Sequence, residues 1–316
     1  MVSAAFTISA EQLALTAGDW REPIAFIDLE HDRASPVDPI RLPCCPVIGV
    51  GDASHPLAQR LDAVIDTHSD GDVMAQAVLR QPQAAAVTAQ LLRLLPDLSL
   101  DHGLTAESLA YATLQGSASH RDWIAARRDE RPSRPTGRVG LQRDGDDLVI
   151  TLDRPEADNA IDRTMRDGLF EAFELAAADT TISRVLLQAA GRAFSLGADL
   201  DEFGTTTDPA MAHMIRCATL PARVAARCAD RLEVHVNGAC VGAGLELAAF
   251  ARRITASRRA WFQLPELAMG ILPGAGGCVS LTRRIGRQRT LLLILSGRRL
   301  SARQALEWGL VDEVVD

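Results

Sequence analysis

The sequence predicts an α/β protein in two parts, a small N-terminal domain and a larger region that follows it. The length of 316 residues suits about two domains of ordinary size. A charged stretch with two prolines and a final glycine indicates a linker at residues 129–137. After this linker, short apolar segments alternate with amphipathic helices, which is typical of the α/β class. The expected parts are therefore residues 1–128 and 138–316.

The N-terminal domain is predicted from short apolar segments followed by helices. One helix ends before Pro96, and a second begins at a weak capping pattern at Thr105. No group of residues in this domain suggests catalysis, and four of its histidines are interpreted as structural or solvated: His55, His68, His102 and His120. The strands are expected at 24–29 and 46–50, and the helices at 84–95 and 105–128.

The second region has a clearer pattern of strands and helices. A helix over 163–177 places Met165, Leu169 and Phe173 on one apolar face. The other elements expected are strands at 147–152, 184–188 and 233–236, and a helix at 244–250.

Composition excludes several classes of function. All 33 basic side chains are arginine, so neither a Schiff-base lysine nor a P-loop lysine exists. The formal net charge of −8 argues against nucleic-acid binding, because such proteins must neutralise phosphates. We therefore expect a small-molecule substrate and no nucleic-acid partner.

No motif for a metal, a disulfide scaffold or a membrane is present in the sequence. The histidines lack HExxH spacing, and the six cysteines form no CxxC pair. The N-terminus lacks the basic and apolar parts of a signal peptide, and no apolar run is long enough to span a membrane. We expect a cytoplasmic protein with no metal, no cofactor and no membrane partner.

Three segments carry residues suited to chemistry. GRAFSLGADL (191–200) follows a predicted strand, VNGACVGAGLELA (236–248) runs from a strand through small residues into a helix, and LPELAMGILPGAGG (264–277) contains a second acid. Free N–H groups at a helix start can hold a carbonyl that gains negative charge. The alternative interpretation is a tight turn whose glycines serve packing.

Two glutamates stand inside these segments. Glu246 has apolar neighbours in its helix, and burial there would raise its pKa and suit it to proton transfer. Glu266 follows Pro265 at the start of an element. Each also has a structural interpretation, Glu246 as a solvated outer-face acid and Glu266 as a first-turn acid that stabilises a helix dipole.

Together the segments resemble the enoyl-CoA hydratase/isomerase family, the crotonase superfamily. RPEADNA (154–160) is similar to the first loop of that family, and the two glutamates have the family's separation of 20 residues. The resemblance spans residues 138–316. It implies a core of repeated ββα units in a spiral, an acyl-CoA substrate and a homo-oligomer, a trimer or hexamer.

The resemblance also implies roles for individual residues. The backbone N–H groups of Ala198 and Ala243 would form an oxyanion hole, and Glu246 and Glu266 would flank the alkene carbons. The residues implied in CoA binding are Arg154, Ala160, Arg192, Ser195, Gly197, Asp199 and Leu200. In the hydratase reaction, one glutamate holds the water and the other delivers the α-proton, with Glu266 favoured as the proton donor. No cofactor besides the CoA thioester is implied.

The sequence departs from the family pattern in four places. Ala243 replaces the usual middle glycine of a triplet, and Asp158 stands where a basic residue is common. The chain ends at Asp316 without the family's usual C-terminal helices, and the first 137 residues have no counterpart in simple hydratases. We hypothesise that this N-terminal region caps the core in place of those helices.

Other reactions remain open on the same scaffold. An isomerase, a thioester hydrolase, a decarboxylase or a cofactor-independent dioxygenase would use similar segments. A non-catalytic acyl-CoA-binding subunit is the alternative outside enzymes.

Overall fold

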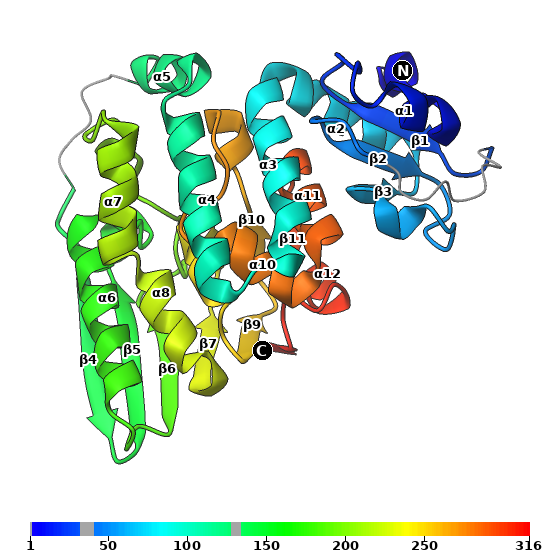
Figure 1. Ribbon diagram of the computed structural model, residues 1–316. Helices are drawn as coiled ribbons and strands as arrows, with labels where there is room; N and C mark the ends of the chain where they lie inside the picture. Colours follow the sequence, from blue (N-terminus) through cyan, green and yellow to red (C-terminus); the bar gives the residue numbers. More distant parts are fainter. Residues whose placement is uncertain (1, 32–40, 128–133) are drawn as a thin grey trace.

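The computed structural model describes residues 2–31, 41–127 and 134–316 (Figure 1). The first five residues of the predicted linker, 129–133, lie outside the described residues. No helix in the described ranges is long and apolar enough to cross a membrane. The α/β class predicted from the sequence is confirmed, since strands and helices alternate along the chain.

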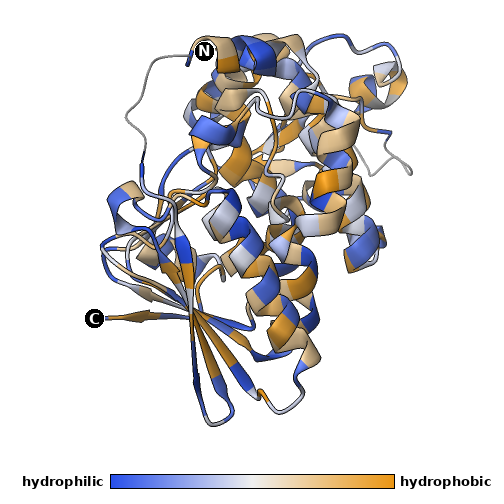
Figure 2. Ribbon diagram, turned by 90° about the vertical axis from the view of Figure 1, so that its left-hand side faces the viewer, coloured by the Kyte–Doolittle hydropathy of each residue, from blue (hydrophilic) through white to orange (hydrophobic). Residues whose placement is uncertain are grey.

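The largest sheet has six strands in the order β12-β9-β7-β6-β5-β4. Its strands are parallel except for the hairpin of β4 and β5. In β5 the inward side chains Leu148, Ile150 and Leu152 alternate with more exposed ones, as expected of a sheet with one buried face. Figure 2 shows these strands on one side of the helices. The strand bounds are β4 (Arg138–Asp144), β5 (Asp147–Asp153), β6 (Arg184–Ala189), β7 (Leu232–Val236), β9 (Arg253–Ser257) and β12 (Glu313–Val315).

A second sheet of three short strands, in the order β11-β10-β8, lies in the same region. Amphipathic helices cover both sheets, and the apolar face of α6 is buried as its spacing predicts. The strands are β8 (Ala239–Val241), β10 (Trp261–Gln263) and β11 (Leu300–Ser301). The helices are α6 (Arg163–Ala178), α7 (Pro209–Thr219), α8 (Pro221–Ala225), α9 (Ala243–Ala248), α10 (Gly277–Ile285), α11 (Arg287–Ser296) and α12 (Ala302–Glu307).

In its described residues, the N-terminal region combines a small parallel sheet, in the order β1-β2-β3, with the helices α1 to α5. The strands are β1 (Ala25–Asp28), β2 (Val47–Val50) and β3 (Ala63–Ile65). The helices are α1 (Ala10–Thr16), α2 (His68–Arg80), α3 (Pro82–Leu94), α4 (Leu100–Gln115) and α5 (Ala118–Ala125).

The single helix predicted over 105–128 is wrong. Ser99 caps the start of α4 by accepting a hydrogen bond from the His102 N–H, so the helix begins one turn before Thr105. It ends at Gly116, and the Ser117 side chain caps a separate helix, α5. Gly116 and Ser117 are a helix stop followed by a helix start.

The helices of the N-terminal region pack directly on the second region. α4 lies along α7 and α10, and α2 and α3 contact α11 (Figure 1). Most of the buried apolar side chains of both regions belong to one continuous core, which runs along the chain from Ile24, next to β1, to Val311. This packing supports the hypothesis that the N-terminal region caps the core.

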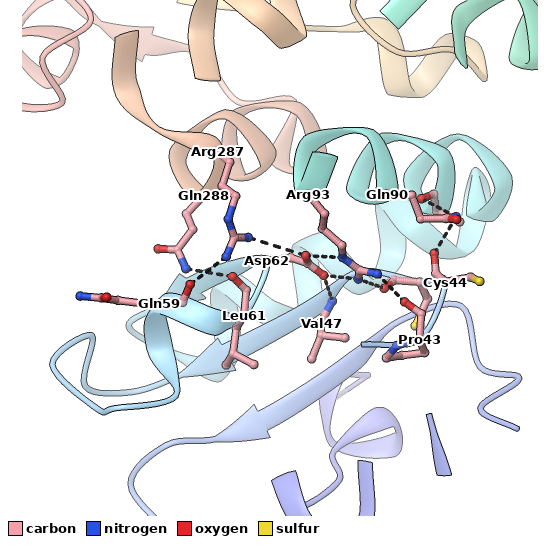
Figure 3. A network of polar contacts seen from close by, with 12 residues as sticks. Pro43, Cys44, Val47, Gln59, Leu61, Asp62, Gln90, Arg93, Arg287 and Gln288 are labelled. Carbon is pink, nitrogen blue, oxygen red and sulfur yellow. Dashed lines mark hydrogen bonds and ion pairs between the residues drawn. The ribbon is translucent and has the colours of Figure 1, made fainter. Parts of the chain in front are cut away.

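A polar network joins the small sheet to α3 of its own region and to α11 of the second region (Figure 3). The buried carboxylate of Asp62 accepts two hydrogen bonds from Arg93 of α3, at 2.7 and 2.6 Å, and one from the Val47 N–H at 2.8 Å. Arg287 of α11 lies 3.8 Å from the same carboxylate, and the Gln288 side chain donates to two carbonyls of the small sheet's loop. The network fixes the small sheet against α11.

Candidate active site

One cavity of about 500 Å³ brings the three chemistry-bearing segments together. Its lining includes the loop at 197–200, the start of α9 and the short 3₁₀ helix η7 (Glu266–Met269). Residues of α4, α6 and α7 complete the wall. The cavity therefore contains residues from both the N-terminal region and the second region.

The two predicted oxyanion-hole groups lie side by side. Strand-like pairing of Ser195 with Cys240 holds the first two segments together, through hydrogen bonds of 2.9 Å on either side. A Cβ added at Gly197 would lie only 3.3 Å from the Ala243 nitrogen. Ala243 is the first residue of α9, so its N–H has no partner within the helix. Within the described residues, neither the Ala198 nor the Ala243 N–H donates to a protein group.

Glu246 is buried, contrary to the solvated interpretation. Its Oε2 accepts hydrogen bonds from the backbone N–H groups of Ala275 at 2.6 Å and Gly277 at 2.9 Å. These donors lie at the N-terminal end of α10, where the helix dipole favours a negative charge. No described residue donates to Oε1, so this oxygen is available to a water in the cavity.

Glu266 lies next to the proposed oxyanion hole. A Cβ added at Gly242 would lie 2.5 Å from its Oε1, and the left-handed φ of Gly242 (48°) also favours glycine there. Its Oε2 is buried and receives no hydrogen bond in the described part of the chain. An acid oxygen without a donor is best accommodated in the protonated form.

The electrostatics separate the two acids. Burial raises the pKa of Glu246 to about 7, against the opposing effect of the two backbone donors. Burial, and then the charge of Glu246, raise the pKa of Glu266 well above its ordinary value. At neutral pH the site can thus hold one ionised and one protonated carboxyl group.

The predicted CoA-binding residues fall into two groups. Gly197, Asp199 and Leu200 line the cavity, as do Ala198 and Ala243. Ser195 and Ala160 are buried behind the lining, where the Ser195 hydroxyl donates to the Asn159 carbonyl. These two residues shape the loop rather than face the cavity.

The interpretation of Arg154 as a phosphate ligand needs correction, while that of Arg192 stays a prediction. Arg154 is buried, its Nη1 lies 2.6 Å from Asp199, and its other donors reach the carbonyls of Pro135 and Ala160. Because its guanidinium is enclosed by protein groups, it cannot meet a phosphate in this conformation. Arg192 is exposed but forms a bidentate pair with Asp158, the acid that replaces the family's usual basic residue.

Residues of the N-terminal region contribute to the site, and the sequence analysis assigned none of them to it: Glu107, Tyr111, Gln115 and His120. Glu107 of α4 is buried and accepts hydrogen bonds from the Gly276 N–H at 2.7 Å and the Val279 N–H at 3.2 Å. It thus shares the N-terminal end of α10 with Glu246. Burial and the Glu246 charge raise the pKa of Glu107 well above its ordinary value.

Tyr111 and His120 line the cavity beside the glutamates. The Tyr111 ring packs against Gly274, where an added Cβ would overlap the ring. Burial raises the pKa of Tyr111 well above its ordinary value, so its hydroxyl stays protonated. His120 is buried and its ring nitrogen Nδ1 bonds the Met269 carbonyl at 2.8 Å, so of its two interpretations, structural or solvated, the structural one holds. More than 140 residues separate each of these pairs, so no local pattern could reveal them.

Comparison with known proteins supports the resemblance seen in the sequence. The family described as enoyl-CoA hydratase/isomerase matches residues 147–316. A 2,3-dehydroadipyl-CoA hydratase of Escherichia coli is 39% identical over 53% of this chain and 65% of its own length. A 1,2-epoxyphenylacetyl-CoA isomerase of the same organism is 37% identical over 54% of this chain and 66% of its own. The chain thus spans just under two thirds of these curated relatives.

A solved structure shows the same fold. A protein of Thermobifida fusca assigned to the enoyl-CoA hydratases, in complex with acetoacetyl-CoA, superposes with a TM-score of 0.52 at 26% identity. The match covers 56% of this chain and 70% of that one. The matched family model, the fold and the ordered motifs agree, and the chain belongs to the enoyl-CoA hydratase/isomerase family.

Proposed function

We propose that this chain adds water across the double bond of an α,β-unsaturated acyl-CoA thioester. The observation that carries the proposal is one cavity lined by two buried carboxyl groups and by two backbone N–H groups that donate to no protein group within the described residues. Hydration needs one group to take a proton, one to give a proton, and donors for the charge on the thioester oxygen. The cavity contains all of these groups.

The geometry supports a division of labour between the acids. The Ala198 and Ala243 N–H groups hold the thioester carbonyl, and donors of this kind contribute about 3–4 kcal/mol each. Ionised Glu246 takes a proton from a water molecule, and the oxygen of that water forms a bond to the β-carbon. Protonated Glu266 gives its proton to the α-carbon, and the electron pair of the alkene forms that bond. Proton exchange between the acids or with solvent then restores the starting state.

The relatives support an acyl-CoA substrate. One is a hydratase of an unsaturated CoA thioester, and a structural neighbour holds acetoacetyl-CoA. We also propose that no cofactor beyond the CoA thioester is needed, because the two acids and two N–H donors account for every proton and charge of the reaction. A homo-oligomer is proposed from the family pattern, and light scattering of the purified chain tests it.

Crotonyl-CoA tests the reaction. We expect the enoyl-thioester absorbance to fall with the wild type, and the rate to drop about 10²–10⁴-fold with Glu246→Gln and with Glu266→Gln. If Glu266→Gln lost activity and Glu246→Gln kept it, a one-acid reaction such as isomerisation would be favoured, and one relative is named as an isomerase. No turnover with intact CoA binding would contradict hydration and favour the non-catalytic alternative.

A further inference from the structure

An arginine without an acidic partner lines the cavity. Arg216 of α7 is partly buried, and no carboxylate of the described residues forms an ion pair with it. Two other arginines line the same cavity, but Arg163 is exposed and Arg166 is paired with Asp167 at 2.6 Å. A partly buried charge is costly unless a counter-charge meets it, so the cavity is suited to an anionic group beside Arg216.

The position of Arg216 is fixed by α4. Its Nε donates to the Ser108 hydroxyl at 3.0 Å, its Nη1 to the Gln115 side chain at 3.1 Å and its Nη2 to the Ser108 carbonyl at 3.2 Å. These neutral acceptors use three of the five guanidinium N–H groups. The remaining two can bind a carboxylate, for which the planar guanidinium is well matched.

Tyr111 contacts Arg216 and lines the same cavity as the two glutamates. The Arg216 guanidinium lies 4.5 Å from the centre of the Tyr111 ring, stacked on its face. The Tyr111 hydroxyl lies within electrostatic range of both Glu246 and Glu266. An acyl chain whose reacting carbons lie between the glutamates can therefore extend past Tyr111 to Arg216.

Glu107, an acid whose charge acts on Arg216, forms no ion pair with it among the described residues. Glu107 is within electrostatic range of Arg216, but its two oxygens accept hydrogen bonds from the N-terminal end of α10. Burial lowers the pKa of Arg216 from its ordinary value, and the neighbouring Tyr111, Cys217 and Glu107 act in the opposite direction. Even so, an arginine remains charged at any working pH.

We infer that Arg216 is a specificity residue that binds a carboxylate at the far end of the acyl chain, so that the preferred substrates are acyl-CoA thioesters of dicarboxylic acids. The inference rests on the proposed function only in that the cavity holds an acyl-CoA. Its position on α7, held by three residues of α4, gives the N-terminal region a direct role in substrate choice.

Binding of saturated acyl-CoA pairs tests the inference without any turnover. Succinyl-, glutaryl- and adipyl-CoA are titrated calorimetrically against butyryl-, valeryl- and hexanoyl-CoA of matched length. We expect the wild type to bind the acid about 10- to 100-fold more tightly at the length that reaches Arg216, as for a hydrogen-bonded charge pair. Arg216→Gln should reduce this ratio to about one, and Arg216→Lys should retain part of it.

Arg223→Gln is the matched control. Arg223 lies on α8, donates to the Thr105 hydroxyl of α4 and does not line the cavity. The Arg223→Gln substitution therefore removes another arginine between the two regions. We expect the ratio of affinities for acidic and neutral ligands to stay within about twofold of the wild-type ratio.

Three results would overturn the inference. The first is a wild type that binds acidic and neutral ligands equally at every chain length, and the second is an Arg216→Gln variant that loses affinity for both kinds of ligand equally. The third is an equal loss of affinity for free CoA in that variant, which would indicate a phosphate contact. Crotonyl-CoA turnover is measured in parallel. An acid preference without hydration would contradict the proposed function and leave Arg216 as a carboxylate ligand, whereas hydration without the preference would contradict this inference alone.

Discussion

The pH dependence of activity follows from the two acids that face the cavity. Hydration as proposed needs Glu246 ionised and Glu266 protonated. Burial raises the pKa of Glu246 to about 7, so kcat/KM for crotonyl-CoA should fall about tenfold per pH unit below that value as Glu246 is protonated. It should fall again at higher pH, when Glu266 loses its proton. A pH–rate profile checks this, and a profile that rises toward low pH would contradict the roles given to the acids.

A single glycine fixes the position of the Glu246 side chain. A Cβ added at Gly277 would overlap the Glu246 Cγ. We expect Gly277→Ala to displace the carboxylate and lower kcat about tenfold or more, because catalytic groups tolerate little misplacement. The matched control is Gly18→Ala, where nothing lies within 4 Å of the added Cβ. Steady-state kinetics compare them, and equal activity of the two variants would be incompatible with this geometry.

The sequence predicts some residues of the site well and others not at all. The oxyanion segments and both glutamates lie in contiguous motifs, so their types and spacing carry the information. The partners of a residue are less visible, which is why Arg154 was misinterpreted: its ion pair with Asp199 spans 45 residues. Glu107 and Tyr111 reach the site only through the packing of α4, and no local pattern encodes that contact.

At the scale of elements, α10 depends on an acid from the other region. Glu107 accepts hydrogen bonds from two backbone N–H groups at the start of α10, which would otherwise be buried without partners. Glu107→Ala should lower the free energy of unfolding by about 1–3 kcal/mol. Denaturant unfolding measures this, with Glu107→Gln, which keeps one acceptor, as the milder variant. Equal stability of wild type and Glu107→Ala would refute the capping role.

Element boundaries show what periodicity can and cannot predict. The helix expected from 163 to 177 is observed as α6, because its apolar face and the Asp162 cap are both local features. The helix expected from 105 to 128 is instead two helices. Its apolar pattern continues across Gly116, and only the Ser117 cap marks the new start. A periodic pattern thus indicates that helices exist, while caps decide where they end.

At the scale of the whole molecule, the network around Asp62 should control how firmly the small sheet is held. Asp62→Ala leaves the partly buried Arg93 without its carboxylate and should cost about 3–5 kcal/mol. The comparison variant is Glu307→Ala, which removes an exposed ion pair with Arg303 and should cost about 0.5 kcal/mol or less. Thermal unfolding of both variants distinguishes a buried network from surface pairing. Similar melting temperatures would count against the network.

The extent of the fold predicted from sequence also differs between the two regions. In the second region, the three expected strands are observed as β5, β6 and β7 and the two expected helices as α6 and α9, while its other strands and helices were not predicted one by one. The N-terminal region has no family pattern, so its β3, α2 and the docking of α4 on α10 were not foreseen. The docking of one helix on another depends on the shapes of their surfaces and on residues more than 100 positions away in the chain. Amino-acid composition and local patterns predict neither of these.

The source of the oxygen in the product tests the central claim most directly. Crotonyl-CoA is incubated with the wild type in water labelled with oxygen-18, and the mass of the product is measured by mass spectrometry. The account predicts a product heavier by one labelled water, with formation strongly reduced in both Glu246→Gln and Glu266→Gln. A product of unchanged mass, or one whose added oxygen comes from dissolved dioxygen, would contradict hydration by this pair of acids.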